Sequence, residues 1–286
     1  MNRIGIYYAY WTRDWDADFL PFVARVKRLG FGALEVNAGT VARMTDEARK
    51  RLVDEAASQD IELSYCVGLP HEFDVAAEDR QTRERGIRYL RDQAAAIGKM
   101  GGGKLSGIIY SSWPSTLPPG EEKAPFVERS IASVREGVKS AEDNNVVFNV
   151  EVVNRFEQFI LNTAGEAVEY VRAIGSPNCK MLLDTFHMNI EEDSMGDAIR
   201  EAGTLLGHLH LGESNRKPPG LGHIPWKEVS AALKAIGYTG SVVMEPFLLP
   251  GGEVGRDIKV WRPIMPGADL DQEAAKSCRF MKEVLK

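Results

Sequence analysis

Cysteines, long apolar runs and an excess of basic residues are all missing or scarce in this sequence of 286 residues. The three cysteines, Cys66, Cys179 and Cys278, are far apart and form no CxxC pair, which favours free thiols in a reducing cytoplasm. No stretch approaches the ~20 consecutive apolar residues of a membrane helix, and no signal-peptide core follows the first residues. We therefore expect a cytoplasmic protein with no membrane partner.

The charge balance also excludes some partners. The chain has 35 Lys and Arg residues and 41 Asp and Glu residues, which gives a net charge of −6. This charge argues against a nucleic-acid partner, because proteins that bind nucleic acids favour basic surfaces. Hydrophobic residues make up 44% and charged residues 27% of the chain, as in an ordinary globular protein. The length suits two average domains or one α/β barrel of about 250 residues with insertions.

Apolar strand-like runs alternate with segments of helical spacing along the whole chain. The predicted strands cover residues 4–10, 33–37, 61–67, 104–110, 146–152, 179–184, 205–211 and 241–245, and the predicted helices 18–29, 45–59 (with Thr45 as N-cap), 79–98, 125–144, 164–174, 195–202, 226–236 and 270–285. Eight such pairs without a linker predict an α/β fold, a single (β/α)8 TIM barrel domain over residues 1–286. Two long irregular stretches, 111–124 and 247–267, are expected on the catalytic face.

Four consecutive predicted strands end on side chains that can bind a metal: Glu151, Asp184, His210 and Glu245. Because active sites of α/β barrels lie at the carboxyl ends of the strands, these side chains should surround one point. Carboxylates with one imidazole suit Mn²⁺, Co²⁺ or Mg²⁺ better than a structural zinc ion. The sequence therefore predicts a divalent metal site.

Each of these residues also has a structural interpretation. Asp184 can simply cap the next helix, and Glu151 can pair with the nearby Arg155. His208 has the same strand parity as His210 and can be a core histidine with satisfied hydrogen bonds, and we choose His210 as the ligand because it lies nearer the strand's carboxyl end. The coincidence over four strands favours the metal site.

Three further polar residues follow these strand ends: Glu157, His187 and Arg216. Arg216 lies in the polar loop 214–219, where its donors can bind substrate oxygens or remain a solvated loop charge. A metal that holds two adjacent oxygens of a hydroxyketone acidifies the neighbouring C–H bond. Two carboxylates on opposite sides of that carbon give epimerisation, whereas one carboxylate and a shuttle between carbons give aldose–ketose isomerisation.

Several motifs resemble the ketose 3-epimerase family, which includes D-tagatose 3-epimerase and D-allulose (D-psicose) 3-epimerase and belongs to the xylose-isomerase-like barrel superfamily. The resemblance spans nearly the whole chain and is carried by residues 5–11 (GIYYAYW), 151–157 (EVVNRFE), 183–193 (LDTFHMNIEED), 207–210 (GHLH), 213–216 (ESNR) and 240–247 (GSVVMEPF). Residues 67–74 and 101–103 differ from the allulose-epimerase pattern and are expected to line or support the far end of the pocket.

The resemblance implies C3 epimerisation of free ketoses (D-fructose/D-allulose, D-tagatose/D-sorbose or L-ribulose/L-xylulose), with Mn²⁺ or Co²⁺ and no organic cofactor. It implies a homodimer or homotetramer. It further implies that Glu151, Asp184, His210 and Glu245 bind the metal, and that Glu151 and Glu245 are also the acid/base pair. Glu157, His187 and Arg216 would bind ketose O1 to O3. Tyr7 and Ile108 would line the substrate pocket, and an apolar wall would be formed by Trp15, Cys66, Trp113 and Phe247.

Three alternatives remain at this point. A hydroxypyruvate isomerase or an inosose dehydratase shares the metal but needs a different substrate clamp. An endonuclease IV-like DNA-repair enzyme would use many histidines and a basic face, against five histidines and a net charge of −6 here. A sugar-binding barrel without catalysis would not need both Glu151 and Glu245.

Overall fold

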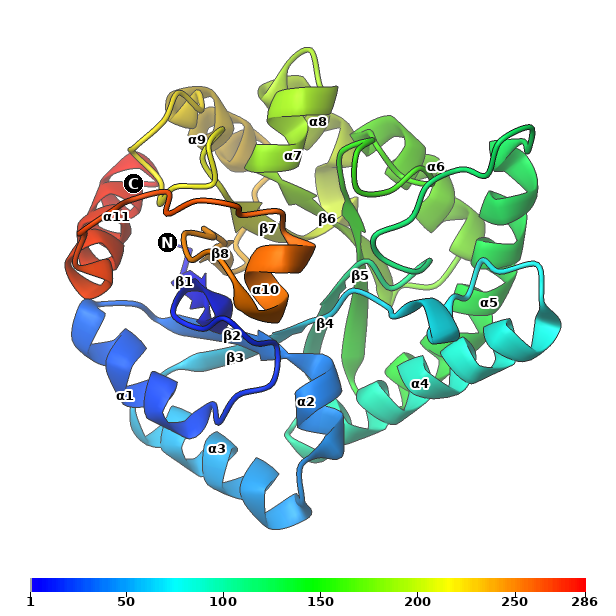
Figure 1. Cartoon of the computed structure of the whole chain (residues 1–286), viewed down its shortest axis with the longest axis horizontal. Helices are drawn as coiled ribbons and strands as arrows, with labels where there is room; N and C mark the ends of the chain where they lie inside the picture. Colours follow the sequence, from blue (N-terminus) through cyan, green and yellow to red (C-terminus); the bar gives the residue numbers. More distant parts are fainter. Residues whose placement is uncertain (1) are drawn as a thin grey trace.

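A closed barrel of eight parallel strands forms the centre of the computed structural model, which describes residues 2–286. The strands follow one another around the barrel in sequence order: β1 (Ile4–Tyr7), β2 (Ala33–Asn37), β3 (Glu62–Cys66), β4 (Gly103–Gly107), β5 (Val146–Val152), β6 (Cys179–Asp184), β7 (Leu206–Leu211) and β8 (Val242–Met244). β8 pairs with β1 and closes the ring (Figure 1). The predicted (β/α)8 barrel is confirmed.

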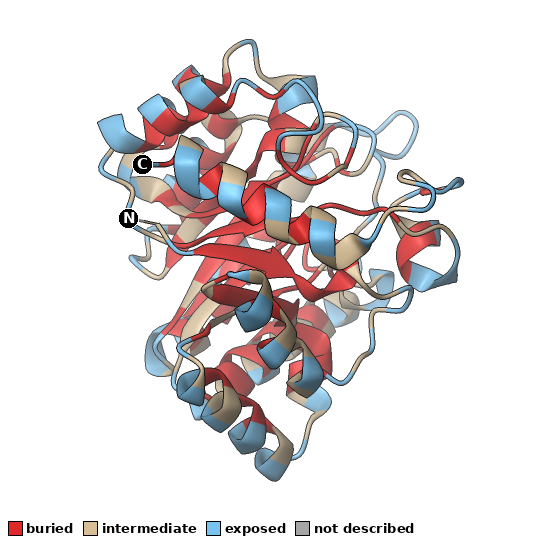
Figure 2. Ribbon diagram, turned by 90° about the vertical axis from the view of Figure 1, so that its left-hand side faces the viewer, coloured by how far each residue is buried: buried red, intermediate tan, exposed pale blue. Residues whose placement is uncertain are grey.

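Helices surround this barrel. They are α1 (Leu20–Leu29), α2 (Ala38–Arg43), α3 (Asp46–Ser58), α4 (Arg80–Lys99), α5 (Lys123–Asp143), α6 (Ala164–Ile174), α7 (Thr185–Glu191), α8 (Met195–Ala202), α9 (Trp226–Ala235), α10 (Gly252–Asp257) and α11 (Leu270–Val284), with short 3₁₀ turns at Tyr8–Tyr10, His71–Phe73 and Gly203–Leu205. The strands and the inner faces of the helices are buried (Figure 2). Such burial on both faces explains why the strands read as short apolar runs.

Local sequence signals fix many of the helix ends. The Thr45 side chain accepts a hydrogen bond from the Ala48 amide and caps α3 as predicted. Thr163 and Glu166 form a capping box at the start of α6. α1 ends at Gly30, whose φ of 94° lies in the left-handed region that glycine adopts without strain.

Two predicted strands extend three residues too far at their carboxyl ends. β1 ends at Tyr7, and the next three residues form a 3₁₀ turn in which Tyr8 donates a hydrogen bond to the Trp15 carbonyl at 2.5 Å. Aromatic residues are common in strands but are also buried in other backbone conformations, so the aromatic residues at positions 8 and 10 made the predicted strand too long. β4 ends at Gly107 rather than at residue 110, because Gly107 has a φ of 113° and approaches the Val67 backbone.

Three helices were not predicted: α2, α7 and α10. α2 and α7 start directly after a strand, and the strand's last residue, Asn37 or Asp184, caps each of them. α10 lies within the long stretch 247–267. Six or seven residues are too few to show helical periodicity, which explains why sequence patterns missed them.

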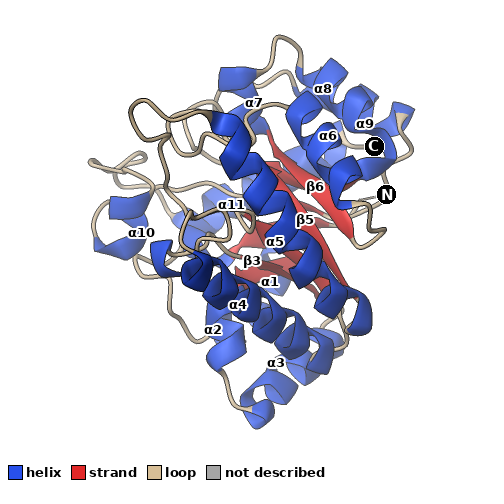
Figure 3. Cartoon of the chain, turned by 90° about the vertical axis from the view of Figure 1, so that its right-hand side faces the viewer, coloured by secondary structure: helices blue, strands red, loops and turns tan. Residues whose placement is uncertain are grey.

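The long loops gather at one end of the barrel. Figure 3 shows α10 and the neighbouring loops at this end, beyond the strands. α10 joins the loop after β1, since the Val254 amide donates to the Arg13 carbonyl at 2.9 Å and Trp15 Nε1 donates to Asp257 at 2.8 Å. The expectation that residues 247–267 lie on the face of the strand ends is therefore met, because Trp15 and Asp257 line the cavity described below.

Two sequence expectations can be compared with residues 2–286 as a whole. Cys66, Cys179 and Cys278 are free, as predicted, and all three are buried. Among the same residues there is no helix with the length and apolar character needed to cross a membrane.

Candidate active site

Four side chains at the carboxyl ends of β5 to β8 form the centre of the site. Ligand atoms of Glu151, Asp184, His210 and Glu245 all lie within 4.8 Å of one another, and all four residues are buried. They converge because neighbouring parallel strands bring their ends to one place: Asp184 and His210 pair directly in the β6–β7 register. The predicted cluster is thus present in the structure.

The four residues lie at different depths. Glu151 and Glu245 are 3% and 7% exposed and line a cavity of about 420 Å³, whereas Asp184 and His210 are fully buried beside them. The two glutamates therefore face the space that a small substrate would occupy. Asp184 and His210 form the floor.

Asp184 is both a helix cap and a member of the cluster. Its Oδ1 accepts a hydrogen bond from the Phe186 amide at 2.9 Å at the start of α7, and its Oδ2 lies 3.3 Å from Arg216 Nη1. The capping interpretation is therefore correct, and it leaves the second oxygen available to the cluster.

His210 presents an unpaired nitrogen to the carboxylates. Its Nε2 lies 2.6 Å from Glu35 Oε1, while its Nδ1 lies 3.6 Å from Glu151 Oε1 and 3.5 Å from Glu245 Oε1. This Nδ1 is buried and has no hydrogen-bond partner within residues 2–286. A buried, unpaired ring nitrogen among carboxylate oxygens fits a divalent cation with oxygen-rich preferences, so the donor set suits the metal that the sequence predicts.

The choice of His210 over His208 is consistent with this geometry. His208 is fully buried, and its Nε2 lies 2.8 Å from Glu35 Oε2. It belongs to the core beneath the cluster, as its structural interpretation expects, but only Nε2 has a hydrogen-bond partner, and Nδ1 has none among residues 2–286. Arg155 does not pair with Glu151 as one alternative suggested, because its guanidinium contacts Glu191 at 2.6 Å.

The buried side chains of the cluster shift one another's pKa values. Burial, together with the nearby Glu245 and Asp184, raises the pKa of Glu151 to about 7, although His210 opposes this. Burial alone would lower the pKa of His210, but Glu245, Glu35 and Glu151 raise it well above its ordinary value. A dication at this point would favour the ionised carboxylates and the neutral imidazole, the forms that bind metals.

Arg216 lies in the site and is not a solvated loop charge. It is 8% exposed, and Nη1 lies 3.4 Å from Glu245 while Nη2 lies 3.4 Å from Glu157. Its guanidinium stacks over the Phe186 ring at 3.7 Å. The loop reaches this position because the buried Glu213 carboxylate binds the amides of Gly220 and Ile224 and the Trp226 indole.

Glu157 and His187 lie beside Arg216 and are held by Asn154. The Asn154 amide N–H donates to His187 Nδ1 at 3.2 Å, so the ring proton of neutral His187 is on Nε2, which faces Asp184 and Arg216. Burial lowers the pKa of His187 and keeps it neutral. Glu157 accepts from Asn154 Nδ2 at 3.1 Å and from Trp113 Nε1 at 3.0 Å, and together with His187 and Arg216 these contacts lower its pKa despite burial.

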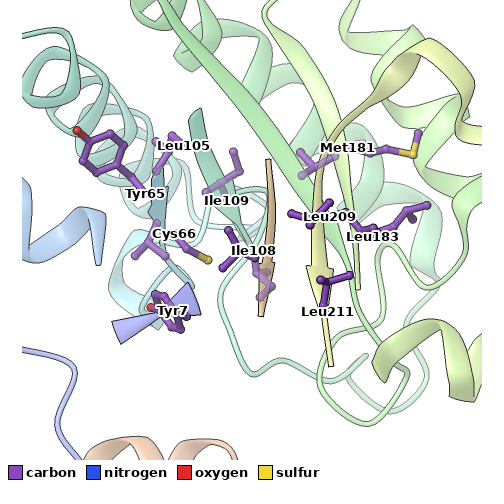
Figure 4. Packing of buried hydrophobic residues seen from close by; sticks show 14 of the residues in the cluster. Tyr7, Tyr65, Cys66, Leu105, Ile108, Ile109, Met181, Leu183, Leu209 and Leu211 are labelled. Atoms are coloured by element: carbon purple, nitrogen blue, oxygen red, sulfur yellow. The ribbon is translucent and has the colours of Figure 1, made fainter. Parts of the chain in front are cut away.

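The cavity is lined by every residue for which the family resemblance implies a pocket position: Tyr7, Trp15, Cys66, Ile108, Trp113 and Phe247. Tyr7 packs against Trp15 and Phe247, and Trp15 against Trp113. Figure 4 shows Tyr7, Cys66 and Ile108 grouped together. Val67, Gly68 and Pro70 also line the cavity, as expected for residues 67–74. Residues 101–103 lie at the start of β4, at the opposite end of the barrel, and do not line it.

Sequence reasoning missed Glu35, Asn154 and the outer residues Thr40, Arg43 and Asp257. Glu35 had a usable signal, because a charged residue between Leu34 and Val36 in a strand buried on both faces needs a partner. Thr40, Arg43 and Asp257 lie on α2 and α10, the short helices that were not predicted.

Comparison with known proteins places this geometry among related barrels. The xylose isomerase-like TIM barrel family model matches residues 23–284. The D-psicose 3-epimerase of Ruminiclostridium cellulolyticum is 45% identical over 284 residues, which cover 98% of this chain and 97% of that protein. The D-psicose 3-epimerase of Agrobacterium fabrum is 40% identical over 284 residues and 98% of each chain. A solved structure of D-psicose 3-epimerase with D-tagatose from Clostridium cellulolyticum H10 has a TM-score of 0.97, 44% identity and 99% coverage of both chains.

Proposed function

We propose the substrates, the metal and the residue roles below for a chain that belongs to the xylose isomerase-like TIM barrel family and, within it, to the ketose 3-epimerases. It is a carbohydrate epimerase that acts at C3 of ketoses. The proposed pairs are D-fructose with D-psicose and D-tagatose with D-sorbose, and L-ribulose with L-xylulose as a further pair.

The observation that carries the proposed mechanism is the pair of glutamates that reach the cavity. Glu151 and Glu245 come from strands on different sides of His210 and are the members of the cluster that line the cavity. Two carboxylates that approach one carbon from two faces remove a proton on one face and return it on the other. This arrangement supports inversion at C3 better than a one-base isomerase or a sugar-binding barrel.

Glu151, Asp184, His210 and Glu245 would hold the metal, for which Mn²⁺ or Co²⁺ is proposed, with Mg²⁺ as a further candidate and no organic cofactor. When bound, the cation supplies Lewis acidity that stabilises negative charge on two adjacent substrate oxygens. The protein's own residues perform the proton transfers and position the sugar.

The proposed clamp for the first three carbons consists of Arg216, Glu157 and His187. Arg216 offers N–H donors, Glu157 a carboxylate acceptor, and His187 the Nε2–H donor fixed by Asn154. These groups hold O1 to O3 so that C3 lies between the two glutamates. The apolar wall of Trp15, Cys66, Trp113 and Phe247 contacts the rest of the sugar and excludes water.

Replacing Arg216 tests the clamp. Arg216→Ala should raise KM for D-fructose and lower kcat together, by roughly 10-fold or more in kcat/KM, because a charged hydrogen bond contributes about 1.5–3 kcal/mol. Steady-state kinetics check this result, with Arg155→Ala as the matched control, since Arg155 pairs with Glu191 outside the cavity. An unchanged KM in Arg216→Ala would remove it from the substrate site.

A product assay tests the proposed substrates. The Mn²⁺-loaded protein is incubated separately with D-fructose, D-tagatose and L-ribulose, and products are identified by NMR. We expect the C3 epimer from each accepted ketose, and the initial rates rank them. An aldose product would instead support the isomerase branch of the superfamily, as in hydroxypyruvate isomerase.

Four expectations stay predictions. We propose that residues 1–286 act as one domain, in which the barrel and its loops form one site. We propose a homodimer or homotetramer, which is supported by large apolar side chains at the surface, Phe156 and Trp261, that are 66% and 74% exposed. A cytoplasmic location and the absence of a nucleic-acid partner also stay predictions.

A further inference from the structure

Glu35 is a buried carboxylate to which neither the sequence patterns nor the proposed mechanism assigns a role. It lies on β2, across the barrel from β7, and is fully buried. A carboxylate removed from water is costly unless its oxygens accept hydrogen bonds, so its contacts define what it does.

Both oxygens of Glu35 are used, and both partners are histidines of β7. Oε1 lies 2.6 Å from His210 Nε2, and Oε2 lies 2.8 Å from His208 Nε2. Because an ionised carboxylate only accepts hydrogen bonds, each imidazole must donate through Nε2. The contact with His210 therefore leaves Nδ1 as the ring nitrogen that faces Glu151 and Glu245.

His208 prevents the carboxylate from turning away. With one oxygen on each histidine, Glu35 cannot rotate without breaking a short buried hydrogen bond. The two imidazole rings lie 5.2 Å apart at 77°, in an edge-to-face arrangement that fixes their planes relative to each other. The direction of the His210 Nδ1 lone pair is thus set by groups that do not touch the substrate cavity.

We propose that Glu35 is a positioning residue for the metal centre: it holds His210 in the ring orientation and tautomer that present Nδ1 to the cation, and His208 locks Glu35 in place. This inference rests on the proposed metal role of His210. Carboxylates that orient a metal-bound histidine typically contribute 10- to 100-fold to metal affinity.

The test measures Mn²⁺ binding directly, by electron paramagnetic resonance of the free ion during titration of the full-length protein. Glu35→Gln should bind Mn²⁺ roughly 10- to 100-fold more weakly than the wild type. At saturating Mn²⁺ its KM for D-fructose should stay near the wild-type value, because Glu35 does not line the cavity. If Glu35 only stabilised the fold, its replacement would not weaken Mn²⁺ binding while leaving KM for D-fructose unchanged.

Two control variants accompany it. Glu62→Gln removes a carboxylate from the neighbouring strand at the other end of the barrel, where it contacts Lys104 and Ser241, and should leave Mn²⁺ affinity unchanged. Glu35→Asp keeps the buried charge but shortens the side chain, so it replaces Glu35→Gln if that variant does not fold. It too should bind Mn²⁺ more weakly.

A His210→Gln variant separates the two levels of the inference. It should lose Mn²⁺ affinity if His210 is a ligand. Retained affinity in His210→Gln would overturn the metal assignment and the positioning role with it. Weak binding by His210→Gln together with affinity within twofold of wild type in the folded Glu35 variant would overturn the positioning role alone.

Discussion

Glu151→Gln and Glu245→Gln should each give a folded protein with almost no epimerase turnover. A glutamine keeps the shape of the side chain but cannot take up or release a proton near neutral pH, and a positioned acid or base contributes roughly 10²- to 10⁴-fold to the rate. Both residues belong to the metal cluster and line the cavity, so we expect losses of at least that size. Initial rates at saturating Mn²⁺ measure the effect, and circular dichroism checks the fold.

The same variants allow a finer distinction. If each glutamate serves one face of C3, the one that remains can still exchange the C3 hydrogen of one epimer with solvent, without inversion. The Glu62→Gln variant, with the same chemical change outside the cavity, should keep full activity. Normal turnover in either Glu151→Gln or Glu245→Gln would rule out the two-base mechanism.

Removal of the metal is the second change with a large expected effect. Dialysis against a chelator should abolish activity, because Glu151, Asp184, Glu245 and the unpaired Nδ1 atom of His210 would then hold no cation to stabilise negative charge on the substrate oxygens. Addition of Mn²⁺ or Co²⁺ should restore activity. The same addition should raise the free energy of unfolding, by about 2.7 kcal/mol at a metal concentration 100 times Kd.

Activity and thermal unfolding measured side by side separate the possible outcomes. Recovery with Mn²⁺ or Co²⁺, together with a higher melting temperature, supports a metal bound at the buried cluster. Full activity in protein shown to be metal-free would remove the metal from the mechanism.

The barrel and the metal cluster were predictable for a common reason. Apolar runs in strands buried on both faces are easy to recognise, and a polar residue that ends such a run stands out, as Asp184 does after Met181–Leu183. Once eight strands are recognised, barrel closure brings the ends of β5 to β8 together without further information. The resemblance to ketose 3-epimerases then assigned roles that residue patterns alone left open.

The remaining parts of the site depend on contacts that no local pattern shows. Arg216 is buried because the Glu213 carboxylate binds backbone amides of the loop that contains Arg216 and continues beyond it. The backbone φ of Arg216 is 60°, which is unusual for a residue other than glycine. Glu35 meets His208 and His210 across the barrel, more than 170 positions along the chain. α2 and α10 are too short to be read from periodicity, so the outer cavity that they line was also missed.

The most direct test of the central claim is deuterium incorporation at C3. The Mn²⁺-loaded protein is incubated with D-fructose in D₂O, and the product is analysed by NMR. Proton removal and return by Glu151 and Glu245 predicts D-psicose that carries deuterium at C3 and at no other carbon. D-psicose that retains the original hydrogen at C3, or a label that has moved between carbons, would contradict the two-glutamate mechanism.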